Sequence, residues 1–113
     1  MAAWYQAHGY EVVSRNWACR GGELDIVARR GELHVFCEVK ARSSDRFGLP
    51  AEAVGPLKQA RVRRLAATWF AAQREVVVGQ IGQGVARRRR RGPVRFDVAS
   101  VLAGQVEVIE GAF

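Results

Sequence analysis

Residues 23–40, with the sequence ELDIVARRGELHVFCEVK, are the segment most informative about the fold. Residues 23–28 and 33–40 each alternate polar and apolar side chains, and the polar segment 29–32 between them contains a glycine. Alternation with a period of two is typical of strands, and a short glycine-containing connection predicts a β-hairpin. One face is expected to belong to the core, with Leu24, Ile26, Leu33, Val35, Cys37 and Val39. The other face is expected to carry Glu23, Asp25, His34, Glu38 and Lys40 around Phe36.

The rest of the chain predicts two helices and three further strands around this hairpin. Apolar residues at helical spacing predict a short helix in residues 1–8 and a second helix in residues 57–73. Aromatic and β-branched residues predict strands, at residues 10–17, 94–102 and 105–109. The glycine- and arginine-rich residues 79–92 predict a mobile basic loop. We therefore expect the 113 residues to form one α/β domain, a mixed central sheet of about five strands flanked by helices in the order α-β-β-β-α-β-β.

Charge is distributed unevenly along the chain. The formal net charge is +7, and residues 1–57 contribute nothing to it because they contain seven basic and seven acidic residues. The eleven basic and four acidic residues of 58–113 predict a polyanionic partner, nucleic acid rather than a membrane. A composition of 49% hydrophobic and 26% charged residues excludes a disordered chain, and no apolar stretch is long enough to span a bilayer. Two cysteines without a disulfide framework, and no secretion signal, predict a cytoplasmic protein.

The polar face of the hairpin carries the residues that suggest chemistry. If the turn centres on residues 30 and 31, Glu23 lies opposite Glu38, and Asp25 lies opposite Phe36. Facing carboxylates repel each other, and one Mg²⁺ held by Asp25 and Glu38 would neutralise them. Such a cation beside the Lys40 ammonium is suited to hydrolysing a phosphodiester. The alternative is an ordinary solvated face, on which Lys40 is only the salt-bridge partner of Glu38.

The order of these residues resembles a nuclease signature. Asp25, followed after twelve residues by Glu38-Val39-Lys40, resembles the Asp…Glu-x-Lys motif of restriction-endonuclease-like nucleases. Four longer segments closely resemble the YraN family: RNWACRGGELDIVARRGELHVFCEVKARSS (15–44), FGLPAEAV (47–54), KQARVRRLA (58–66) and RFDVASV (95–101). Members of this family are small bacterial proteins that are predicted to be endonucleases and thought to be related to archaeal Holliday-junction resolvases. The resemblance covers nearly all of residues 4–113.

This resemblance implies a restriction-endonuclease-like fold and metal-dependent hydrolysis of DNA, including branched or junction DNA, with Mg²⁺ or Mn²⁺. The implied catalytic residues are Asp25, Glu38 and Lys40, and Glu23 would join the two acids as a metal ligand. Family members usually begin with a longer first helix that carries a further glutamate, and that position would precede Met1 here. The first helix is therefore expected to be truncated, either because part of the site is missing or because the start lies upstream. Related nucleases often act as dimers, so the resemblance also implies a homodimer.

Several basic or polar residues are candidates for binding the phosphate backbone of nucleic acid, DNA rather than RNA. They are Lys58, Gln59, Arg61, Arg42, Arg87, Arg88, Arg89, Arg90 and Arg91. Gln59 is included because related nucleases often place a glutamine near the site. For the arginine run the alternative is a solvated loop, and for the helix it is an ordinary wet face.

Two kinds of residue outside the hairpin pattern also need an interpretation. Asp97 is expected to be structural, as the partner of an arginine, and Trp17 and Phe36 are either core residues or base-stacking surfaces. The sequence leaves three hypotheses for function. They are a metal-dependent nuclease, a nucleic-acid-binding module of the same fold that does not cut, and a basic adaptor that docks on a protein or ribonucleoprotein partner.

Overall fold

The computed structural model describes residues 1–41, 54–81 and 92–113. They form a five-stranded sheet and two helices in the order α-β-β-β-α-β-β, which confirms the predicted α/β fold with a mixed sheet. The elements are α1 (Ala2–Ala7), β1 (Glu11–Cys19), β2 (Gly22–Arg30), β3 (Leu33–Ala41), α2 (Pro56–Ile81), β4 (Val94–Leu102) and β5 (Gln105–Ile109).

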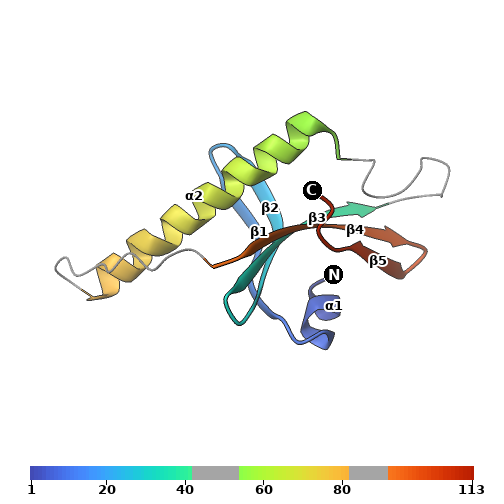
Figure 1. Cartoon of the computed structure of the whole chain (residues 1–113), viewed down its shortest axis with the longest axis horizontal. Coiled ribbons are helices and arrows are strands. Elements are labelled where there is room, and N and C mark those ends of the chain that lie inside the picture. The colour runs from blue at the N-terminus through green and yellow to red at the C-terminus, as the bar shows by residue number, and fades with distance from the viewer. Residues whose placement is uncertain (42–53, 82–91) are drawn as a thin grey trace.

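The five strands lie side by side in the order in which they occur along the chain. β1, β2 and β3 pair antiparallel, as do β4 and β5, whereas β3 and β4 are parallel. Parallel neighbours require a crossover connection, and α2 belongs to the segment that makes it. Figure 1 shows α2 running across one face of the sheet and α1 lying on the other side.

The second helix is longer than the sequence predicts. It begins at Pro56, a residue suited to the first helical position, and continues through Gly79 to Ile81. A single glycine weakens a helix by about 1 kcal/mol but does not have to end it, so the predicted loop starts too early. Of that predicted loop, residues 82–91 lie outside the described residues. Neither described helix combines the length and apolar character needed to cross a membrane.

The hairpin forms where predicted, but its pairing differs by two residues. Phe36 pairs with Val27, so the predicted pairing of Phe36 with Asp25 is wrong, as is that of Glu23 with Glu38. Residues 31 and 32 connect the two strands. Gly31, the first of these residues, has a φ of 59°. This left-handed conformation suits glycine and not the arginine that the predicted turn would place first. The observed register ends with Ile26 opposite Cys37, so Asp25 and Glu38 are the next residues along the two strands.

Each face of the sheet is covered by a cluster of buried side chains. One cluster lies beneath α1 and the other lies beneath α2. The cluster on the α1 side contains Tyr5, Tyr10, Ile26, Ala28, Val35, Cys37 and Ala99. The cluster on the α2 side contains Leu24, Val27, Phe36, Val62, Leu65, Ala66 and Trp69. Cys37 is therefore a packing residue, and burial raises the pKa of its thiol to about 12.

Phe36 belongs to the core and is not a base-stacking surface. It is fully buried, and its ring centroid lies 5.8 Å from that of Trp69 and 5.5 Å from that of Phe70. His34 also lies beneath α2, 5.0 Å from the Phe70 ring, and Trp17 packs against the same cluster. The expectation of a solvated face around Phe36 is therefore wrong, because α2 covers this part of the sheet.

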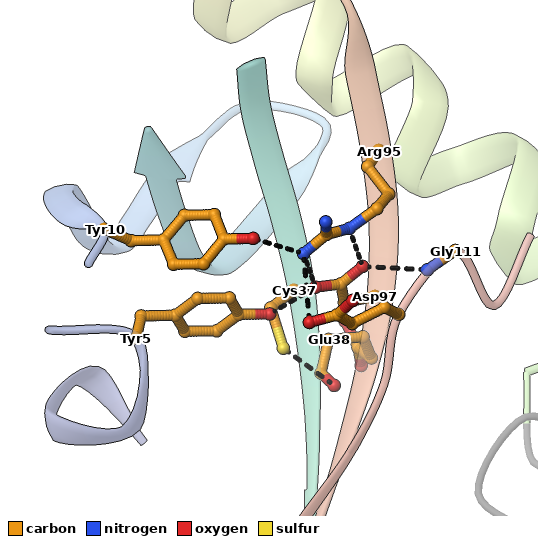
Figure 2. A network of polar contacts seen from close by, with 8 residues as sticks. Tyr5, Tyr10, Cys37, Glu38, Arg95, Asp97 and Gly111 are labelled. Atoms are coloured by element: carbon orange, nitrogen blue, oxygen red, sulfur yellow. Dashed lines mark hydrogen bonds and ion pairs between the residues drawn. The ribbon is translucent and has the colours of Figure 1, made fainter. Parts of the chain in front are cut away.

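Asp97 is a fully buried carboxylate that joins several parts of the chain (Figure 2). Arg95 donates to both of its oxygens, from Nε to Oδ1 at 2.8 Å and from Nη2 to Oδ2 at 2.9 Å. The Tyr5 hydroxyl in α1 donates to Oδ2 at 2.7 Å, and the Gly111 N–H donates to Oδ1 at 3.0 Å. Arg95 also donates to the Tyr10 hydroxyl at 3.1 Å. The structural interpretation of Asp97 as the partner of an arginine is confirmed.

Replacing Asp97 with asparagine should destabilise the protein by about 3–5 kcal/mol, because the mostly buried Arg95 guanidinium loses its close charged partner and keeps the exposed Glu110 carboxylate at 3.8 Å. Chemical denaturation measures this change. The matched control is Glu11→Gln, which breaks an ion pair with Arg29 whose side chains are 64% and 45% exposed. That change should cost no more than about 1 kcal/mol. Equal losses in the two variants would contradict the central role of Asp97.

Candidate nuclease site

The site begins at an irregularity in β2 that turns Asp25 towards β3. Leu24 packs in the cluster on the α2 side, whereas Ile26, two residues further on, packs on the α1 side. The alternation of β2 is therefore interrupted at Asp25. β1 is also irregular here, since Asn16 has a φ of 48° and is missing from an otherwise paired stretch. The Asp25 carboxylate accepts a hydrogen bond from the backbone N–H of Val39 at Oδ2, over 2.8 Å, which fixes its position beside β3.

Glu38 lies on β3 and is held by lysines from two elements. Its Oε1 is 2.7 Å from Nζ of Lys58, in the first turn of α2, and 3.8 Å from Nζ of Lys40, two residues along the same strand. The side chain of Glu38 is only 14% exposed, so these contacts lie largely out of water. We refer to Asp25, Glu38, Lys40 and Lys58 as the acid–lysine cluster.

The ionisable groups of the cluster perturb one another. Burial raises the pKa of Asp25, and the Glu38 carboxylate raises it further, against the opposing effects of the Val39 N–H and the two lysines. The neighbouring Lys58 side chain and burial lower the pKa of Lys40, although both carboxylates oppose this. Burial alone would lower the pKa of Lys58, but its close contact with the Glu38 carboxylate outweighs burial and raises it. Perturbed groups that share one location are typical of functional sites.

The structure brings together three of the residues predicted to be catalytic, Asp25, Glu38 and Lys40. Glu23 does not join them, because it is exposed at a position opposite Ala18 of β1. Among the described residues, no group of three or more His, Cys, Asp or Glu side chains could hold a metal ion. Glu23 as a third metal ligand therefore stays a prediction, and the interrupted alternation of β2 separates it from Asp25.

The remaining predicted residues divide into those near the cluster and those that the structure does not describe. Lys58, predicted only as a candidate for phosphate binding, lies inside the acid–lysine cluster. The Gln59 amide donates from Nε2 to the Val54 carbonyl at 2.9 Å, which holds the segment preceding α2, and Arg61 is exposed on the helix. Outside the described residues lie Arg42, Arg87, Arg88, Arg89, Arg90 and Arg91.

The donor set fits one hard divalent cation held by two carboxylates. Mg²⁺ usually keeps several waters and binds through one or two carboxylate groups, so it does not need a third acidic side chain. Asp25 and Glu38 are close enough for each other's charge to matter, and carboxylate oxygens are the ligands that Mg²⁺ and Mn²⁺ prefer. The same oxygen of Glu38 that would bind a cation is already paired with Lys58.

The ion pair between Lys58 and Glu38 was not predicted from the sequence. The helical pattern identifies Lys58 as a polar residue of the first turn of α2, but it does not show which strand this turn approaches. Arg63 was missed for the same reason. Its guanidinium lies 5.2 Å from the ring centroid of Phe96 and 5.4 Å from that of Phe113, so it packs on aromatic side chains.

Fold and site together define a small α/β protein whose central hairpin presents two carboxylates and one lysine, which a second lysine from α2 joins in one cluster. The profile of the uncharacterised protein family UPF0102, which is the YraN family, matches residues 1–101, and the chain belongs to this family.

Family members from several bacteria are similar over most of their length. The UPF0102 protein of Beutenbergia cavernae is 52% identical over 113 aligned residues, which cover 96% of this chain and 84% of the relative. The proteins of Frankia alni and Frankia casuarinae are 60% and 46% identical, and the alignments cover 95% of this chain and 82% and 83% of the relatives. These names state the family and no activity.

Asp25→Asn should stabilise the metal-free protein at about pH 7, because asparagine keeps an acceptor for the Val39 N–H but removes a charge that the fold disfavours. The pKa of Asp25 is raised on folding, so the stability that its protonated form provides is lost as the pH rises through the folded pKa. The gain in the variant should therefore shrink as the pH is lowered through that range. Urea denaturation with a chelator present, at a series of pH values, measures it. An equal gain in stability from Glu23→Gln, which neutralises an exposed carboxylate, would show that the effect does not come from the environment of Asp25.

Proposed function

We propose that the protein is a metal-dependent nuclease that hydrolyses phosphodiester bonds in DNA, including branched or junction DNA. The observation that carries the proposal is the convergence of Asp25, Glu38 and Lys40 at one place on the β2–β3 hairpin. These are the three residues that match the Asp…Glu-x-Lys motif. The two-residue shift in register supports the proposal, because it makes Asp25 and Glu38 neighbours across the hairpin.

Asp25 and Glu38 would hold the metal ion, Mg²⁺ or Mn²⁺. When bound, such an ion polarises a phosphoryl oxygen and lowers the pKa of a bound water. Asp25 contributes a fixed carboxylate, because the Val39 N–H orients it before any ligand arrives. Lys40 offers an ammonium beside Glu38 to stabilise the negative charge that develops on the phosphate. Because Lys58 lowers its pKa, Lys40 also releases a proton to a partner more easily than an ordinary lysine does.

The first turns of α2 supply a surface suited to the phosphate backbone. Residues 56–73 contain four basic residues and no acidic one. Arg61 and Arg64 are exposed and three residues apart, so they lie on the same face of the helix, and Lys58 precedes Arg61 by three residues. This basic face is continuous with the acid–lysine cluster through Lys58, which supports DNA as the substrate.

Cleavage of branched, duplex and single-stranded DNA tests the proposal directly. With Mg²⁺ or Mn²⁺ the protein should cut at least one of these substrates, and a chelator should abolish cutting. Asp25→Asn and Glu38→Gln should each lower the rate by at least about a hundredfold, the scale on which removing one group that stabilises transition-state charge acts.

Glu11→Gln is the matched control for these two variants, because it neutralises an exposed carboxylate on the same sheet, at the first residue of β1. Its cleavage rate should equal that of the unmodified protein. Salt-sensitive binding of DNA without cutting would replace the nuclease with a binding module, and cutting that persists in Asp25→Asn would place the activity elsewhere.

Neutralising Arg61 and Arg64, which are exposed on α2, should weaken DNA binding in a salt-dependent way. We expect the double variant Arg61→Gln/Arg64→Gln to lower the slope of log K against log salt by about 0.9 for each phosphate that it no longer neutralises. Arg63→Gln is the control, since this arginine has the same charge and helix but lies over the Phe96 and Phe113 rings. Arg63→Gln should change the free energy of unfolding more than it changes the salt slope. Fluorescence anisotropy with labelled duplex at several salt concentrations measures the slopes, and chemical denaturation measures the stability. Equal slopes for the unmodified protein and both variants would exclude this face.

A further inference from the structure

The shortest ion pair of the acid–lysine cluster joins α2 to β3. Lys58 Nζ lies 2.7 Å from Glu38 Oε1, compared with 3.8 Å for Lys40 Nζ. The Lys58 side chain is 25% exposed, so the pair is shielded from water more than an ordinary surface salt bridge. In the absence of any metal, Glu38 is therefore already paired with a cation, and that cation is supplied by the helix.

The two ammonium groups of the cluster depend on Glu38 to stay together. Lys40 and Lys58 both approach Oε1 of Glu38, at 3.8 and 2.7 Å, although like charges repel. The carboxylate of Glu38 offsets this repulsion because both ammonium groups share its Oε1. A divalent cation bound at Oε1 would add positive charge where the carboxylate now offsets the repulsion, which favours the departure of one ammonium group.

Of the two lysines, Lys58 is the one placed to leave. Lys40 extends from the same strand as Glu38, two residues further on, so it stays on the same face of the hairpin. Lys58 comes from a separate element, α2, through a flexible four-carbon stem. Its ammonium can leave Glu38 by a change of side-chain rotamer, without any change in the hairpin.

We propose that Lys58 is a stand-in cation, which occupies Glu38 in the metal-free protein and is displaced when a divalent metal binds there. The inference rests on the proposed function, since it concerns the same two carboxylates. Lys58 is then a positioning residue that sets the concentration at which the metal fills the site. The displaced ammonium stays beside the cluster, where a phosphate group is an available new partner.

The affinity of the protein for Mn²⁺, with no DNA present, tests this role. Electron paramagnetic resonance of free Mn²⁺ counts the bound ions in the unmodified protein and in Lys58→Met, which keeps an apolar stem but has no charge. Lys58→Met should bind Mn²⁺ about three- to tenfold more tightly, the range expected when one partly buried competing ion pair is removed. Lys58→Arg, which keeps the competing charge, should bind with nearly the original affinity.

Arg61→Met is the matched control for the loss of one positive charge on the same helix. Arg61 lies one turn beyond Lys58 and is exposed, and its charge acts on Lys58, so the control reports the effect of a nearby positive charge that is not paired with Glu38. It should change the affinity less than about twofold, since exposed charges are screened by salt. Far-UV circular dichroism checks that each variant is folded.

Three outcomes would overturn the inference, and they differ in what they say about the nuclease. Mn²⁺ binding that requires Asp25 and Glu38 but is equal or weaker in Lys58→Met would refute the stand-in role and leave the proposed function intact. The absence of Mn²⁺ binding in both proteins would refute the stand-in role together with the metal site itself. Tighter binding in Lys58→Met and in Arg61→Met by the same factor would also refute it, since the effect would then be general charge.

Discussion

The structure depends on a charge buried at its centre. Asp97 is fully buried, and a carboxylate in such a place is stable only when its oxygens are paired and hydrogen-bonded. Its partners come from α1, from β4 itself and from the segment after β5, and Arg95 extends the network to Tyr10 at the start of β1. One side chain thus joins parts of the chain that lie at its two ends, as Figure 2 shows.

The same network helps to fix the strand that carries the proposed chemistry. Cys37 of β3 pairs with Asp97 of β4, and Glu38 is the next residue on β3, paired with Val98. Because successive side chains point to opposite faces, Cys37 faces α1 and Glu38 faces the side of α2. Glu38 therefore meets the first turn of α2, and Lys58 is the residue of that turn which reaches it. The register between β3 and β4 thus positions the Asp97–Arg95 pair on one face of the sheet and the acid–lysine cluster on the other.

The sequence predicts the elements of this fold well because local periodicity carries the information. The strands at 94–102 and 105–109 and the α-β-β-β-α-β-β order agree with the structure, as does the pairing of Asp97 with an arginine. The register of the hairpin was predicted wrongly because it depends on which two residues form the turn, and the backbone preference of Gly31 settles that. Alternation also cannot distinguish a solvated face from one covered by a helix, so the sequence leaves open whether Phe36 is a core residue or a base-stacking surface, and the structure places it in the core.

In the candidate site, too, local sequence patterns identify some residues, whereas the positions of others depend on tertiary packing. Asp25, Glu38 and Lys40 could be identified because they lie on one hairpin, whereas the exclusion of Glu23 depends on the interrupted alternation of β2. The part played by Lys58 depends on how α2 crosses the sheet, and no local pattern encodes that.

The contrast between the whole chain and the acid–lysine cluster explains how charge is used. The chain has a formal net charge of +7, yet the formal charges of two carboxylates and two ammonium groups in the cluster cancel. In the proposed function, the arginines of α2 attract a phosphate backbone, whereas the neutral cluster in its metal-free form does not. The cluster would gain a net positive charge when a divalent cation is added, and Lys58 is paired with one of the two oxygens that Glu38 offers to such a cation. DNA binding and chemistry are then assigned to different groups, and Lys58 takes part in both.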